Sequence, residues 1–230
     1  MTNSIDKRIK YYLILDTETT NGNSDNLNPH DCLFYDFGAA VIDKRGKVYD
    51  SVSFINYDIF VRENDLMNSA YYAEKIPTYI SQLRDGSRQM KTLYEIEQEV
   101  RKLIEKYNIK VVVAHNARFD SATLNATQRY ITKSKYRYFL PYGLEWWDTL
   151  KMARTTIGKQ KTYIRFCQQN GFVTKQNKPR LTAEILYKYI TNNLDFIESH
   201  TGFEDVSIEK EIFAKCMAQH KKMEKKLWKD

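Results

Sequence analysis

Cysteine is scarce and long apolar runs are absent in this chain of 230 residues. The three cysteines, Cys32, Cys167 and Cys216, lie far apart and show neither zinc-site spacing nor a disulfide framework. No apolar stretch approaches the roughly 20 residues that cross a bilayer. The polar N-terminus MTNSIDKRIK also lacks the apolar centre of a signal peptide. The sequence therefore predicts buried or incidental thiols and a soluble, cytoplasmic protein without membrane contact.

Internal repeats and recognisable linkers are absent as well. With 42% hydrophobic and 28% charged residues, the composition is that of an ordinary globular protein. A chain of this length suffices for one substantial core. We therefore expect a single α/β domain over residues 1–230, with a core from about 11 to 216 and a basic tail from 217 to 230. The tail could contact nucleic acid or a partner, but a solvated, frayed helix is the simpler expectation.

Positive charge is in excess, with a net charge of +7 and a pI near 9.1. Such a balance suits a polyanionic partner, because Lys and Arg displace counterions from phosphates. The 17 tyrosines and 11 phenylalanines could stack on bases, although most of them are expected in the core or the sheet. Composition therefore allows nucleic-acid binding without establishing it.

Apolar patterning predicts a sheet flanked by helices. Strands are expected at 11–15, at 33–43 and 47–56 as a hairpin around KRG, and at 110–116. Helices are expected at 92–107, from about Phe119, from Asp148, at 181–190 with Thr182 as N-cap, and at 206–215. A loop is expected at 20–31, and Pro77 is expected to break helical periodicity between 71 and 85.

Four acidic residues follow these elements in a pattern that could bind metal. Asp16 and Glu18 end the first strand at i and i+2, so both side chains share one face, about 7 Å apart. Asp120 follows the strand at 110–116, and Asp205 lies near the start of the last helix. Mg²⁺ and Mn²⁺ prefer oxygen ligands, and two such ions can stabilise both oxygens of a phosphodiester displacement. Taken singly, each acid could be a solvated surface charge or a helix cap.

Three motifs occur in a fixed order along the chain. They read LDTETT at 15–20, VAHNARFD at 113–120 and HTGFED at 200–205, with WDTLKMAR at 147–154 between the last two. In this order the sequence resembles the DEDD superfamily of 3′→5′ exonucleases, in its histidine-bearing DEDDh branch, which includes the proofreading epsilon-subunit-like enzymes. The insertion after Glu18 and SAYYAEKIP at 69–77 are more similar to stand-alone bacteriophage members.

The resemblance implies an RNase H-like α/β fold with a mixed five-stranded sheet. It also implies 3′→5′ hydrolysis of single-stranded or frayed DNA by a two-metal mechanism, with Mg²⁺ or Mn²⁺. By the same resemblance the metal ligands are Asp16, Glu18, Asp120 and Asp205, with Asp16 bridging both ions. His200 is implied as the general base, a role that suits an imidazole with a pKa of about 6.5.

Residues beside the implied ligands are candidates for holding the terminal nucleotide: Thr17, Thr19, Asn116 and Phe119. Local turn and cap bonding is the alternative for the three polar residues, and core packing is the alternative for Phe119. His115 is expected to pack or hydrogen-bond near the strand end rather than to catalyse.

Within the third motif, family members often carry alanine and a second aspartate where this chain has Gly202 and Glu204. Gly202 is a small replacement and Glu204 keeps the negative charge. Asp205 is unaffected, so neither change is expected to cost activity.

Three functions stay open at this point. The first is a DNA exonuclease in replication or repair, which would need a separate polymerase as partner for proofreading. The second is a ribonuclease or oligoribonuclease of the same mechanism, and the third is a non-catalytic module that binds nucleic acid or a polymerase. The complete set of acids and His200 argues against the third. DNA is preferred over RNA as the partner, although that choice depends on whether the pocket accepts a 2′-hydroxyl.

Overall fold

The computed structural model describes residues 5–20, 28–68, 70, 73–198, 200–220 and 222–228. The expected loop at 20–31 and the SAYYAEKIP segment at 69–77 therefore lie partly outside the described residues. Within the described ranges, no helix has the length and apolar character needed to cross a bilayer. The three cysteines are all buried and free, as predicted.

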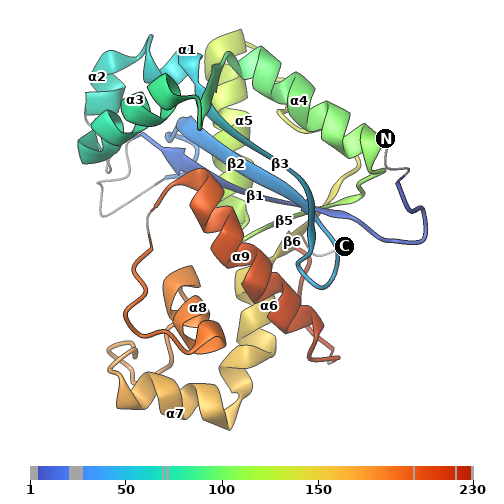
Figure 1. The fold of residues 1–230 in the computed structure, drawn as a ribbon, viewed down its shortest axis with the longest axis vertical. Coiled ribbons are helices and arrows are strands. Elements are labelled where there is room, and N and C mark those ends of the chain that lie inside the picture. Colours follow the sequence, from blue (N-terminus) through green and yellow to red (C-terminus); the bar gives the residue numbers. More distant parts are fainter. Residues whose placement is uncertain are drawn as a thin grey trace.

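A mixed six-stranded sheet forms the centre of the molecule (Figure 1). Its order is β4 (Gln89–Lys91), β3 (Val48–Asn56), β2 (Phe34–Ile42), β1 (Tyr12–Thr19), β5 (Val111–Ala114) and β6 (Glu145–Asp148). Strands β1, β2 and β3 pair antiparallel, and the other neighbours pair parallel. The predicted α/β class and mixed sheet are confirmed. The resemblance implies five strands, one fewer than the six observed, and apolar patterning does not identify β4 because three residues are too few to show alternation.

The turn between β2 and β3 confirms the predicted hairpin. Gly46 adopts a left-handed φ of 78°, a conformation that costs glycine little because it has no Cβ. The Asp43 carboxylate accepts hydrogen bonds from the backbone N–H groups of Arg45 and Lys47, at 2.8 and 3.2 Å. Gly46 therefore supplies the turn conformation, and Asp43 supplies its cap.

Helices cover both faces of the sheet (Figure 1). The α-helices are α1 (Tyr57–Phe60), α2 (Asn64–Asn68), α3 (Ile76–Asp85), α4 (Leu93–Lys106), α5 (Arg118–Thr132), α6 (Thr149–Thr155), α7 (Lys161–Gln169), α8 (Ala183–Thr191) and α9 (Gly202–Met217), with 3₁₀ turns at Ala73–Lys75 and Ile157–Lys159. Leu13 and Leu15 of β1 belong to the core under α4 and α5, whereas Ile14 belongs to the core under α6 to α9. Strand β1 is therefore buried from both sides.

Capping residues place several helix starts where the sequence predicts them. Thr92 and Glu95 form a reciprocal capping box at α4, and the Thr182 side chain caps α8. Asp148 caps α6 by accepting from the Leu150 N–H at 2.9 Å. The expected break at Pro77 is wrong, because this residue lies in the first turn of α3, where a missing N–H leaves no intrahelical bond unmade.

Two glycines bring α9 onto the sheet at the level of the first motif. Gly38 of β2 pairs with Asp16 of β1, and the first residue of α9, Gly202, lies directly over it. A Cβ on Gly38 would stand 2.1 Å from the Gly202 carbonyl oxygen, and a Cβ on Gly202 would stand 2.9 Å from the Gly38 nitrogen. Only glycine allows this approach, which brings Asp205 close to Asp16 and Glu18.

The basic C-terminal tail pairs with the edge of the sheet. The Asp148 N–H donates to the Lys225 carbonyl at 2.7 Å, and the Leu227 N–H donates to the Trp146 carbonyl at 2.8 Å. Leu227 is buried in the core that α4 covers. The expectation of a frayed, solvated helix is therefore wrong for residues 222–228, because backbone pairing with β6 and burial of Leu227 outweigh the repulsion among the lysines.

Candidate active site

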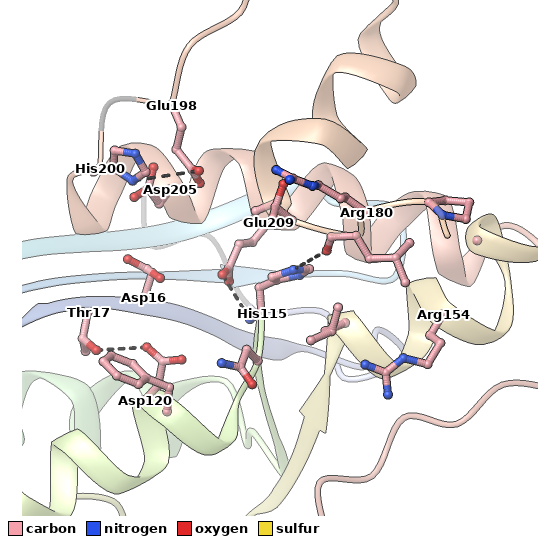
Figure 2. Close-up of a pocket in the computed structure, with 18 of the residues that line it drawn as sticks. Asp16, Thr17, His115, Asp120, Arg154, Arg180, Glu198, His200, Asp205 and Glu209 are labelled. Carbon is pink, nitrogen blue, oxygen red and sulfur yellow. Dashed lines mark hydrogen bonds and ion pairs between the residues drawn. The ribbon is translucent and has the colours of Figure 1, made fainter. Parts of the chain in front are cut away.

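The four acids of the motifs and His200 line one pocket of about 980 Å³ (Figure 2). Strand β1 supplies Asp16 and Glu18, which project from the face of Ile14. The first turn of α5 supplies Asp120. The start of α9 supplies Asp205, and His200 lies just before that helix. The structure thus brings together all five residues that the sequence singles out.

Asp120 is held by a threonine of the first motif. The Thr17 hydroxyl donates to Asp120 Oδ1 at 3.0 Å (Figure 2). Burial raises the pKa of Asp120 to about 7, although the hydrogen bond from Thr17 opposes that shift. Thr17 therefore orients a candidate metal ligand from within the pocket.

Glu18, His200 and Asp205 form the tightest group of ligand atoms. One ligand atom from each residue lies within 4.8 Å of the others. Burial is the main cause that raises the pKa of Asp205 to about 8, and the charge of Glu198 adds to it. Burial also raises the pKa of Glu18 well above its usual range, and the like charge of Asp205 raises it further. Acids this close stay ionised only if a cation neutralises them.

Glu209 belongs to the same acid cluster, although none of the three motifs includes it. It lies on α9 with its side chain buried, and its Oε1 accepts from the His115 N–H at 3.0 Å (Figure 2). Burial raises the pKa of Asp16 well above its usual range, and Glu209 is the largest charge that raises it further. Glu209 stands four residues after Asp205 on a predicted helix, so helical spacing could have identified it.

The donor set fits divalent cations. Asp205 Oδ1 and Glu209 Oε2 are buried and accept no hydrogen bond from the described residues. Such orphaned oxygens are costly unless something compensates them. The pocket offers carboxylate oxygens and one imidazole, and hard ions such as Mg²⁺ and Mn²⁺ prefer oxygen donors. The residues present therefore match the ions that the sequence predicts.

His200 has the environment of a neutral imidazole. Burial lowers its pKa below the usual 6.5, and the nearby Lys75 charge lowers it further. Its Nδ1 lies 3.9 Å from Glu198 Oε2 (Figure 2). Its backbone carbonyl accepts from Lys75 Nζ at 3.2 Å. Glu198 has a pKa raised to about 7 by burial. It precedes α9 in an irregular segment, where no periodic pattern could have identified it.

His115 is occupied by structural hydrogen bonds, in agreement with the sequence-based expectation. Its Nδ1 contacts the Thr149 hydroxyl at 2.9 Å, and its Nε2 contacts the Leu181 carbonyl at 3.0 Å. Burial lowers its pKa, which keeps the ring neutral. The ring therefore ties the end of β5 to α6 and to the segment before α8.

The four candidates for nucleotide binding differ in their positions. Thr17, Asn116 and Phe119 line the pocket. Asn116 is exposed at a left-handed φ of 60°, and its N–H donates to Asp148 Oδ1 at 3.1 Å. Phe119 is half-buried at the pocket wall. Thr19 is buried outside the pocket lining, next to the Cys32 thiol. A nucleotide-binding role for these residues stays a prediction.

Three basic residues also line the pocket: Arg154, Lys178 and Arg180. Arg154 projects from α6, while the other two flank a short bridge between Val173 and Pro179 that precedes α8. Figure 2 shows Arg154 and Arg180 across from the acids. Guanidinium and ammonium groups suit phosphate oxygens. The sequence analysis did not identify them, because isolated basic residues carry no local pattern.

The raised carboxyl pKa values predict that the metal-free protein loses stability as pH rises. Folded-state values of about 7 for Asp120 and about 8 for Asp205 exceed the usual value of 3.8. At pH values between the usual pKa and the raised pKa values, the folded state binds more protons than the unfolded state. The free energy of unfolding therefore decreases with increasing pH. We expect the Tm in EDTA to fall from about pH 5 to about pH 8, and Mn²⁺ to reverse the fall.

Thermal unfolding across this pH range, with EDTA or Mn²⁺, checks the expectation. The Asp205→Asn variant lacks one of the shifted carboxyls, so its Tm in EDTA should depend less on pH. A Tm in EDTA that stays constant or increases toward pH 8 would contradict the predicted charge balance.

Comparison with known proteins supports the fold through structure alone. No protein-family model and no curated protein matches the sequence. A 3′-exonuclease solved in a study of 3′-end-specific recognition of histone mRNA stem-loop is 13% identical, with a TM-score of 0.55 over 99% of this chain and 71% of that chain. Cell-death related nuclease 4 is 12% identical, with a TM-score of 0.59 over 94% and 66%.

A further solved structure, exonuclease I from Methylocaldum szegediense, is 15% identical, with a TM-score of 0.51 over 93% of this chain and 41% of that chain. This chain therefore spans less than half of that exonuclease. At such identities the similarity shows that the chain shares the fold of 3′-exonucleases.

Proposed function

We propose that this protein is a metal-dependent 3′→5′ exonuclease of the DEDDh type, which removes nucleotides from single-stranded or frayed DNA ends. The observation that carries the proposal is the meeting of Asp16, Glu18, Asp120, His200 and Asp205 in one pocket. The fold shared with solved 3′-exonucleases supports it independently.

Asp16, Glu18, Asp120 and Asp205 would hold two Mg²⁺ or Mn²⁺ ions. When bound, these ions neutralise charge on the attacking and leaving oxygens of the phosphodiester. The Thr17 hydroxyl fixes the orientation of Asp120. Glu209 belongs to the same cluster, and its Oε1 accepts a hydrogen bond from the His115 N–H. The acids are therefore positioned by the fold before any ligand arrives.

His200 would accept the proton of the attacking water. Its lowered pKa keeps the ring neutral at pH 7, as a base requires. Glu198, 3.9 Å from Nδ1, would stabilise the imidazolium that forms. The water oxygen bonds to phosphorus, the bond to the 3′ oxygen of the preceding nucleotide breaks, and that oxygen takes up a proton. The products are a 5′-mononucleotide and a strand shortened by one nucleotide.

The terminal nucleotide would be held between two walls of the pocket. Asn116 and Phe119 offer an amide and an aromatic ring on one side. Arg154, Lys178 and Arg180 offer positive charge to phosphate oxygens on the other. Thr17 contributes by orienting Asp120, and a role for Thr19 would have to act through its backbone because its side chain lies outside the lining.

The experiment uses a 5′-labelled single-stranded DNA and an RNA of the same sequence, each with Mg²⁺, Mn²⁺ or EDTA. We expect a ladder that shortens from the 3′ end, faster for DNA, and no shortening in EDTA. Faster cleavage of RNA would favour the ribonuclease alternative over the DNA exonuclease. No shortening of either strand with either metal would overturn the proposal and favour a non-catalytic, polymerase-binding or nucleic-acid-binding role.

Location and partners complete the proposal. We place the enzyme in the cytoplasm and propose a separate polymerase as its partner in any proofreading role.

A further inference from the structure

A groove of about 650 Å³ lies outside the candidate active site. Its aromatic lining residues are Tyr138, Tyr142, Trp146 and Trp228, and we refer to it as the aromatic groove. Ser121 and Asn125 of α5 also line it. Asp120 and Phe119, the neighbours of Ser121, line the active-site pocket instead. The first turns of α5 thus border both hollows, so one strand could run from the groove to the acids.

Three rings of the aromatic groove are turned to solvent. Tyr138 and Trp228 are each 58% exposed, and Tyr142 is fully exposed. Single exposed aromatic residues are common on protein surfaces, but several around one hollow indicate a binding site. Aromatic rings offer a large contact area while losing few rotamers on binding.

Buried neighbours hold these rings in place. Phe139 and Leu140 are buried in the core, and the Phe139 N–H donates to Asn125 Oδ1 at 3.1 Å. On the other side, buried Leu227 pairs with β6, and its carbonyl accepts from Lys151 Nζ at 2.8 Å. Tyr138 and Trp228 are therefore adjacent to fixed residues, so a ligand would meet a preordered surface.

Positive charge accompanies the rings. The Arg129 guanidinium lies 5.5 Å from the Tyr138 ring centroid. Lys226 lines the groove, with Nζ 3.7 Å from Glu145 Oε1. The segment that leads into Tyr138 reads KSKYR at residues 133–137. Cations bind phosphates and ring faces stack on any base, a combination that suits a single strand, whose bases are free to stack.

We propose that the aromatic groove binds the single-stranded part of the nucleic-acid substrate, on the 5′ side of the terminal nucleotide, by stacking bases on Tyr138, Tyr142 and Trp228. The placement relative to the 3′ end rests on the proposed exonuclease function. Binding itself requires no hydrolysis, so the two proposals can fail separately.

Fluorescence anisotropy in the Asp16→Asn background measures strand binding without degradation. The probe is a 5′-labelled oligothymidylate of about 12 nucleotides, within the range that such sites cover. Replacing both Tyr142 and Trp228 by alanine is expected to raise the Kd by roughly 10- to 100-fold, because each ring stacks on a base. Tyr94→Ala is the matched control, since Tyr94 on α4 is 66% exposed and lies outside the groove. A Kd change no greater than that of the control would overturn the proposal. A protein would then be favoured as the partner that binds the groove.

Hydrolysis by the enzyme with Asp16 intact gives a second, independent readout. The 4-nitrophenyl ester of thymidine 5′-monophosphate carries one nucleotide and cannot reach the groove. For the double variant we expect kcat/KM on the long strand to fall about tenfold relative to that on the ester. An equal fall on both substrates would overturn the groove proposal. Should the wild-type protein hydrolyse neither substrate, the exonuclease proposal fails while the anisotropy result still decides the groove.

Discussion

Replacing Asp16 by asparagine is expected to lower exonuclease turnover by roughly a thousandfold or more while the protein stays folded. Asp16 lines the same pocket as the other acids. Burial raises its pKa well above the usual range, and the charges of Glu209, Asp120 and Asp205 raise it further. Asparagine keeps the shape of the side chain but removes the charge that a cation needs. The measurement is the rate of 3′ shortening of labelled DNA with saturating Mn²⁺.

The thermal stability of Asp16→Asn gives a second test of the same assignment. The variant lacks a buried carboxyl with a raised pKa, so its Tm in EDTA near neutral pH should equal or exceed that of the wild type. Added Mn²⁺ should raise its Tm less than it raises the wild-type value. Asp195→Asn is the control, because Asp195 is exposed and outside the pocket. Wild-type turnover in Asp16→Asn would remove the two-metal assignment.

The acids of the site were singled out by the order of the three motifs and by the resemblance that these motifs carry, and each acid also stands at the end of a strand or the start of a helix. Asp16 and Glu18 end an apolar strand, Asp120 opens the helix after another, and Asp205 lies in the first turn of an amphipathic helix. Strand alternation and helix periodicity are properties of short segments, so a single sequence reveals them. Glu209 lies on the same helical face as Asp205, so helix periodicity could also have identified it.

Other parts of the site depend on contacts between distant segments. Glu198 lies in an irregular segment, and Lys178 and Arg180 flank a bridge between α7 and α8, so local patterning does not mark any of them. Strand β4 consists of three residues that pair with β3, and the tail pairs with β6. These pairings depend on contacts across the whole fold, and local propensity does not predict them.

The start of α9 at Gly202 is held by a hydrogen bond that the sequence does not reveal. The Gly202 N–H donates to Asp36 Oδ2 at 3.1 Å, and Asp36 Oδ1 pairs with Arg88 at 2.5 Å, all of them buried. A carboxylate at a helix N-terminus is favoured by the helix dipole. Asp36 therefore fixes the start of α9, and with it the position of Asp205, although no motif includes it.

Replacing His200 by alanine is expected to slow turnover by roughly 10²- to 10⁴-fold, the usual contribution of a general base. The acids remain, so Mn²⁺ should still raise the Tm of the variant. The exposed His30, outside the pocket, supplies the control variant His30→Ala. This combination, slow hydrolysis with retained metal stabilisation, separates a base from a metal ligand. Loss of the Mn²⁺ effect would instead make His200 a ligand, in line with its place beside Glu18 and Asp205.

The pH profile of the same variant tests the proton transfer itself. Burial and Lys75 lower the pKa of His200 below 6.5, so the ring is neutral above that value and becomes protonated as the pH falls through it. At saturating Mn²⁺, kcat/KM of the wild type should therefore decrease on the acid side with the titration of one group. His200→Ala removes that group, so its acid limb should become shallower. A variant with full rate at neutral pH, or with an unchanged acid limb, would take His200 out of the mechanism.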